Sequence, residues 1–171
     1  IVSIMAATIV SILYSYLFYK KKMAAGEKLK IQYNKKTIVI YVIVSVFVVI
    51  FTIWTLFWGG IDISFHDNDF TVEAQGWSDY TVGYEQIDSI SYKENLFQNG
   101  NDRRTNGMGN LKYGMGNFRN DIYGDYIRYT HASCHSYVVM DIGGKILVVN
   151  GADGSETKKI YDTLREKCQM N

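Results

Sequence analysis

The chain carries two uncharged apolar runs near its N-terminus, residues 1–19 and 37–58. A membrane-spanning helix needs about 20 consecutive apolar residues, because it rises ~1.5 Å per residue and the hydrocarbon core of a bilayer is about 30 Å thick. The second run also ends in an aromatic cluster typical of a membrane interface, Trp54, Phe57 and Trp58. We therefore predict two transmembrane helices, the first shortened by the loss of residues before Ile1.

A buried core helix is the alternative for the second run, and a cleaved signal peptide is the alternative for the first. A signal peptide carries its positive charges before the apolar run, whereas here the lysines follow it. The pattern favours two spans.

From residue 61 onward, short runs of alternating apolar and polar residues are typical of β-strands. About seven strands are predicted, at 61–65, 70–74, 80–84, 88–93, 125–131, 135–142 and 145–150. Gly143-Gly144 joins the last two as a tight hairpin, since glycine adopts the positive backbone angles of such turns. This part of the chain is predicted to form a small mainly-β barrel or sandwich.

One amphipathic α-helix is predicted to close the barrel at the C-terminus. Asp153 can cap its first turn, and Glu156 stands three residues later, as in a capping box. Five residues then fall on one face at helical spacing: Thr157, Ile160, Tyr161, Leu164 and Cys168.

Charge separates the same two parts. Residues 1–58 contain seven lysines and one acid, which gives a net charge of +6. Residues 59–171 carry 11 Lys and Arg against 16 Asp and Glu, which gives −5, and the two parts sum to the +1 of the chain. We therefore divide the chain into a membrane region, 1–58, with a basic loop at 20–36, and a domain, 59–171. An acidic domain argues against nucleic acid as a partner.

Short lysine-rich loops stay on the cytoplasmic side of a membrane, and residues 59–69 contain no Lys or Arg. The domain is therefore predicted to be extracytoplasmic. Binding of anionic lipid by the lysines of 20–36 is compatible with the same topology.

Several motifs of the domain resemble the bacterial pleckstrin-homology (PH) domain family, whose members often follow transmembrane helices. In chain order they are RRTNGMGNLKYGMGNF, YGDYIRY, VVMDIGGKILVVN and DGSETKKIYDTL. The resemblance covers about 62–166, is strongest from 103 to 164, and includes Thr105-Asn106-Gly107, Gly114, Phe118, Tyr123-Gly124, Asn150, Thr157 and Tyr161. It implies a PH-like barrel in an integral protein of a bacterial plasma membrane, and it supplies no catalytic residues.

The glycine stretch 107–118 contains the letters GMGN twice. A phosphate-binding loop needs Gly-Lys followed by Ser or Thr, but Lys112 is followed by Tyr113. The dinucleotide fingerprint fails as well, because Lys112 stands where the third glycine belongs and no helical pattern follows. We interpret the stretch as a flexible loop with a glycine-bearing strand entry, and predict no cofactor.

His131, Cys134 and His135 form the densest cluster of chemically reactive side chains. All three residue types can ligate zinc or copper, but a fourth ligand must come from elsewhere, so a polar loop is the favoured interpretation and no metal is predicted. Cys134 and Cys168 are the only cysteines. A disulfide between them is one possibility, and two free thiols are favoured.

Arg103 and Arg104 are paired cations in an acidic domain; a solvated loop edge is the favoured interpretation, and contact with an anion or a partner is the alternative, for which they are the candidate residues. With three histidines and no Gly-x-Ser-x-Gly motif, no catalytic set is apparent. We therefore predict a non-enzymatic, membrane-anchored domain that binds a protein partner or assembles with itself. Two alternatives stay open: a metal- or redox-dependent envelope protein using His131, Cys134 and His135, and an accessory subunit of a transporter.

Overall fold

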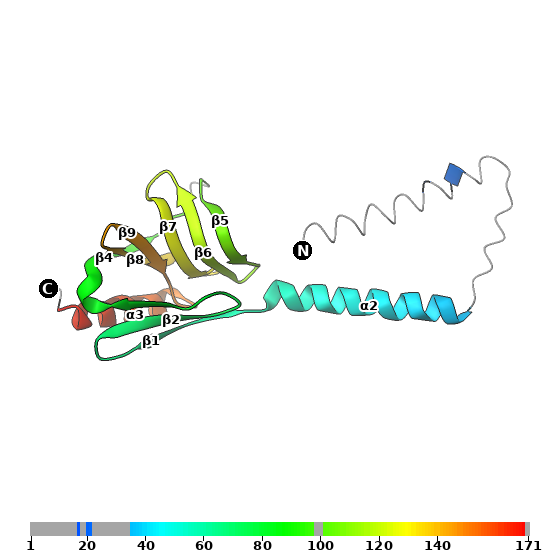
Figure 1. The fold of residues 1–171 in the computed structure, drawn as a ribbon, viewed down its shortest axis with the longest axis horizontal. Coiled ribbons are helices and arrows are strands. Elements are labelled where there is room, and N and C mark those ends of the chain that lie inside the picture. Colours follow the sequence, from blue (N-terminus) through cyan, green and yellow to red (C-terminus); the bar gives the residue numbers. More distant parts are fainter. Residues whose placement is uncertain (1–16, 18–19, 22–34, 98–100, 170–171) are drawn as a thin grey trace. The chain divides into compact units, whose positions relative to one another are not determined.

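The structure, a computed structural model, describes residues 17, 20–21, 35–97 and 101–169 (Figure 1). The chain divides into two compact units, Ile1–Phe47 and Val48–Asn171. Helix α2 runs over Lys35–Phe57, and most of its described side chains are exposed. All strands and the C-terminal helix belong to the second unit.

Within the described part of the chain, no helix combines the length and the apolar character needed to cross a membrane. The prediction of two membrane spans is therefore wrong, and its first span, 1–19, lies outside the described residues apart from Leu17. The predictions derived from it are wrong as well: a bilayer partner bound through two spans, and an integral membrane location with an extracytoplasmic domain.

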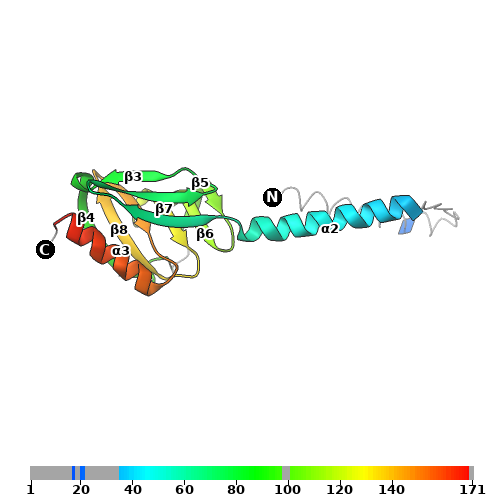
Figure 2. The same ribbon diagram turned by 90° about the horizontal axis from the view of Figure 1, so that it is seen from below.

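Besides the end of α2, the second unit contains two sheets and the C-terminal helix (Figures 1 and 2). The smaller sheet is antiparallel, in the order β1 (Gly60–Phe65), β2 (Asp69–Gln75) and β3 (Tyr80–Gly83). A single turn of 3-10 helix, Tyr84–Gln86, leads from it into the larger sheet. The mainly-β prediction with a C-terminal helix is confirmed.

The larger sheet has the strand order β4-β8-β9-β7-β6-β5. Its members are β4 (Ile87–Glu94), β5 (Arg103–Gly109), β6 (Tyr113–Asn120), β7 (Gly124–His131), β8 (Ser136–Ile142) and β9 (Lys145–Val149). All neighbours are antiparallel except β7 and β9, which run parallel. The described residues thus form nine strands rather than about seven, because β5 and β6 arise from the glycine stretch that was predicted as a loop.

The main core lies between the two sheets and helix α3 (Gly154–Lys167), which packs beside β4 and β8 (Figure 2). Strand alternation sends one face of each sheet inward. The buried side chains are Phe70, Val72 and Val82 from the small sheet, Met115, Tyr129, Val138, Met140, Leu147 and Val149 from the large sheet, and Ile160 and Leu164 from α3. Full burial of such side chains contributes about 1.5–3 kcal/mol each.

Helix α3 begins where the sequence predicts. The Asp153 carboxylate accepts from the Glu156 N–H at 2.9 Å. The Glu156 carboxylate does not return to the Asp153 backbone, as in an ordinary capping box, but accepts from the Ala152 N–H at 2.7 Å. The cap therefore also fixes the chain segment that enters the helix.

The outer face of the large sheet carries a second cluster of buried residues, Phe118, Tyr126, Tyr137, Val139 and Val148. The Arg128 guanidinium lies 4.6 Å from the Phe97 ring centre and 4.5 Å from that of Phe118, and it pairs with the largely buried Asp102. Tyr126 donates to the same carboxylate, and burial raises the pKa of its hydroxyl. Arg128, Asp102 and Tyr126 thus provide one another with polar partners inside a second, smaller core.

The two GMGN copies form the β5–β6 hairpin and pair with each other, Gly107 opposite Gly116 and Gly109 opposite Gly114. The turn between them is held by the Asn110 carboxamide oxygen, which accepts from the N–H groups of Lys112 and Tyr113 at 2.8 and 3.0 Å. The prediction of a flexible loop is wrong here. The glycines are needed because two backbones approach more closely than side chains permit.

Replacing Gly107 by alanine tests this close approach. The residue has φ +142°, and an added Cβ would lie 2.1 Å from the Met115 carbonyl oxygen. We expect Gly107→Ala to lower the free energy of unfolding by more than about 3 kcal/mol in chemical denaturation. The control is Gly124→Ala, with φ +65° and no atom within 4 Å of the added Cβ, for which we expect a loss of about 1 kcal/mol. Equal losses in the two variants would contradict the close-approach explanation.

Candidate groove between β1 and α3

Strand β1 is an edge strand whose outer side has no strand partner among the described residues. Ile61, Ile63 and Phe65 lie opposite Ala74, Val72 and Phe70 of β2, so their side chains share the face turned to the core. Only alternate residues of an antiparallel strand bond to a given neighbour. Two hydrogen bonds show which residues point outward in β1: the Ile63 N–H donates to the Asp62 carboxylate at 2.9 Å, and the His131 ring bonds to the Ile61 backbone.

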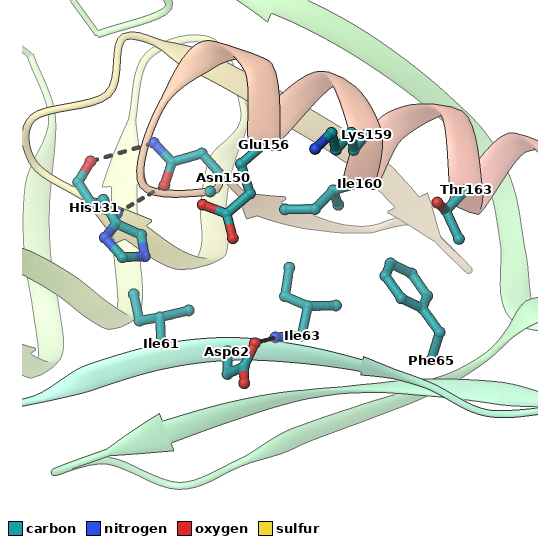
Figure 3. A pocket seen from close by; sticks show the side chains of 11 residues that line it. Ile61, Asp62, Ile63, Phe65, His131, Asn150, Glu156, Lys159, Ile160 and Thr163 are labelled. Atoms are coloured by element: carbon teal, nitrogen blue, oxygen red, sulfur yellow. Dashed lines mark hydrogen bonds between the residues drawn. The ribbon is translucent and has the colours of Figure 1, made fainter.

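A hollow of about 150 Å³ lies between β1 and α3. Figure 3 shows Ile61, Ile63 and Phe65 projecting from β1 toward the helix, and Glu156 projecting from the helix toward β1. The hollow has room for several water molecules or for one medium-sized side chain of a ligand. Its lining also includes Asp62, His131, Asn150, Gly151, Lys159, Ile160 and Thr163.

Asn150 positions one end of the groove. Its side chain is only 1% exposed, and its carboxamide oxygen accepts from the His131 N–H at 2.7 Å (Figure 3). The amide group donates to the carbonyl oxygens of His131 and Cys134, at 3.2 and 3.3 Å. One side chain therefore joins the end of β9, where it sits, to the end of β7 and to the β7–β8 turn.

Thr157 extends this network into α3. Its hydroxyl donates to the Asp153 carbonyl at 2.7 Å, accepts from the Gly151 N–H at 3.0 Å and lies 3.3 Å from the Cys134 sulfur. No buried polar side-chain atom in the described residues lacks a hydrogen-bond partner. Such satisfied networks fix one arrangement of the segments they join, so the groove has a rigid end wall.

The His131 ring lies half-buried at this wall, 5.2 Å from the Tyr113 ring in an edge-on contact. Burial lowers the pKa of the imidazole below its ordinary value; the nearby Glu156 charge and the hydrogen bond to the Ile61 backbone oppose this only in part. The ring is therefore neutral at neutral pH.

The sequence cluster of His131, Cys134 and His135 does not assemble as a metal site. Cys134 is buried, with its thiol directed to the Ser136 carbonyl and to Thr157, whereas the His135 side chain is exposed. The described residues include no group of three His, Cys, Asp or Glu side chains able to hold a metal ion. Both cysteines are free, so the alternative of a Cys134–Cys168 disulfide is not realised.

Arg103 and Arg104 lie together at the start of the edge strand β5, where both are exposed. Arg103 stands opposite Arg119, and the Arg104 guanidinium lies over Gly109. Neither residue lines the groove between β1 and α3. Their role as partner or anion contacts stays a prediction.

Comparison with models of known protein families, with curated proteins and with solved structures finds no match. The PH-like resemblance thus remains a prediction. Sequence reasoning missed the groove residues Ile61, Asp62, Ile63, Lys159 and Thr163, because only the long-range packing of α3 beside β1 makes them neighbours. One signal in the sequence could have pointed to this strand. Asp62 lies between the apolar residues Ile61 and Ile63, which places a charge on the face of the strand away from the core.

Removal of the Asn150 side chain tests the network. Asn150→Ala leaves the His131 N–H and two carbonyl groups without their partner, and unsatisfied buried groups cost about 1–3 kcal/mol each. We expect about 3 kcal/mol lower stability in urea unfolding. The exposed Asn117 supplies the control, Asn117→Ala, with a change under about 0.5 kcal/mol. A similarly small loss at both positions would show that Asn150 does not organise this region.

His131 predicts a pH dependence. Because its pKa is lower in the folded than in the unfolded protein, the unfolded state binds the proton more readily, and stability falls as pH drops through the unfolded value of about 6.5. Thermal unfolding between pH 7.5 and 5.5 should show this loss in the wild type and a smaller one in His131→Asn. His135→Asn, at an exposed position, should follow the wild type. A steeper loss in His131→Asn would contradict the assignment.

Proposed function

We propose that this chain is a non-enzymatic binding protein whose domain takes an extended segment of a protein partner along the outer edge of β1. Peptide recognition by strand addition uses main-chain hydrogen bonds for affinity and pockets for alternate side chains for specificity. The outward backbone groups of Ile63 and Phe65 supply the first, next to that of Ile61, which already bonds to the His131 ring, and the hollow beside α3 supplies the second.

The observation that carries the proposal is the adjacency of a free strand edge and a helix-lined groove. Other edges offer less: β3 has four residues, and β4, at the end of the large sheet, has α3 packed against it. The edge of β5 carries the paired arginines but does not line the groove. β1 joins an outward backbone to the hollow beside α3.

Asp62 also has an ordinary structural role, because charged residues on edge strands discourage aggregation. Its bond to the Ile63 N–H is exposed, however, and a partner carbonyl can replace it at little cost. No observation favours the metal- or redox-dependent alternative, since the cluster of His131, Cys134 and His135 is dispersed.

The test fills the groove. Random twelve-residue peptides are selected for binding to the full chain, and the best are measured against Thr163→Trp, whose indole occupies the hollow. Asp162→Trp, on the exposed side of α3, is the control. We expect Thr163→Trp to weaken binding at least tenfold and Asp162→Trp to leave it unchanged. N-methylation of every second peptide amide gives two variants, one for the odd and one for the even positions. One variant should lose binding and the other should keep it, because only alternate N–H groups of an added strand bond to β1.

Several outcomes would overturn the proposal: no selected peptide, equal binding to both tryptophan variants, or insensitivity to amide methylation in either register. Self-association is the remaining outcome. If the chain forms concentration-dependent dimers that Thr163→Trp abolishes, the occupant of the groove is a second copy of this chain. That result would replace the separate protein partner of the proposal.

A further inference from the structure

The charges around the β1 edge are unbalanced. Asp62 and Glu73 stand opposite each other in the register of β1 and β2, on the face away from the core, and Asp79 joins them around an open hollow of about 390 Å³. Glu156 adds a fourth carboxylate from the α3 side of the edge. Lys159 is the one lysine or arginine lining either hollow.

None of these four carboxylates forms an ion pair within the described residues. Each accepts one hydrogen bond instead: Asp62 from the Ile63 N–H, Glu73 from the Ser64 hydroxyl, Asp79 from the Ala74 N–H and Glu156 from the Ala152 N–H. His131 does not compensate them, because its buried ring is neutral at neutral pH.

The apolar and the acidic side chains of this edge lie on opposite faces of the β1–β2 pair. Ile61, Ile63 and Phe65 turn toward the groove, while the Asp62 side chain turns to the other face of the strand (Figure 3) and borders both hollows. Glu73 stands opposite Asp62 in the register and shares that face. A strand added beside β1 alternates its own side chains between the same two faces. Its groove-facing residues meet aliphatic and aromatic side chains, and its other residues meet carboxylates.

We propose that the segment bound along β1 alternates apolar with basic residues: apolar side chains enter the groove beside α3, and Lys or Arg side chains contact Asp62, Glu73 and Asp79. This inference rests on the proposed function and specifies its ligand. Opposite charges placed directly across neighbouring strands stabilise the pair, and like charges oppose it. The edge therefore accepts basic strands and rejects acidic ones.

Three synthetic eight-residue peptides test the charge preference: each alternates valine with lysine, with threonine or with glutamate. Each is titrated into the full chain labelled with ¹⁵N, and the amide signals of Ile61, Ile63 and Phe65 report binding at the edge. We expect the lysine peptide to bind about five- to tenfold more tightly than the threonine peptide at low salt, with the advantage lost as salt rises. The glutamate peptide should bind most weakly.

The double variant Asp62→Asn, Glu73→Gln keeps both hydrogen-bond acceptors and removes two charges. We expect it to reduce the advantage of the lysine peptide to about twofold or less. Glu85→Gln, Glu94→Gln is the matched control, because it removes the same charge from exposed positions outside both hollows. The control should retain the wild-type preference.

The outcomes separate the two proposals. If the three peptides shift the edge amides with equal affinity, or if the control loses the preference as fully as the test variant, the charge inference is overturned while strand addition at β1 stands. If none of the peptides shifts these amides at millimolar concentration, the proposed function fails and the charge inference fails with it.

Discussion

The buried carboxamide of Asn150 is the interaction on which the rest of the domain depends. Three hydrogen bonds from one side chain hold the end of β7 and the β7–β8 turn against the end of β9. Thr157 continues the same network into the first turn of α3. An amide that is neutral can do this without the desolvation cost of a buried charge. The direction of α3, and therefore the width of the groove beside β1, follows from this junction.

Local patterns in the sequence predicted the elements whose signals are local. The alternation of 135–142 and 145–150 around Gly143-Gly144 gives the β8–β9 hairpin, and the spacing of Thr157, Ile160 and Leu164 gives the buried face of α3. Asp153 caps the helix as expected. In each case the residues that decide the structure are within a few positions of one another.

Other features depend on residues that are remote in the chain. The GMGN repeat reads as a loop because glycine is rare in strands, yet its copies pair because each supplies the space that the other requires. The membrane prediction followed from the length of the apolar runs, the aromatic cluster at 54–58 and the position of the lysines, and it was wrong for the described helix. The groove has no motif, since Ile61 and Thr163 become neighbours only after both sheets and α3 have packed.

The position of β9 has a consequence for how the chain reaches this structure. β9 follows β7 and β8 in sequence but lies between them in the sheet, antiparallel to one and parallel to the other. During synthesis, β4 with β8 and β5 with β6 and β7 can therefore exist only as two separate halves until residues 145–149 emerge. Non-local and parallel pairings form slowly. A nascent chain that has not yet released β9 exposes two unpaired strand edges and the apolar faces behind them, which makes residues 145–149 the segment that joins the two halves of the sheet.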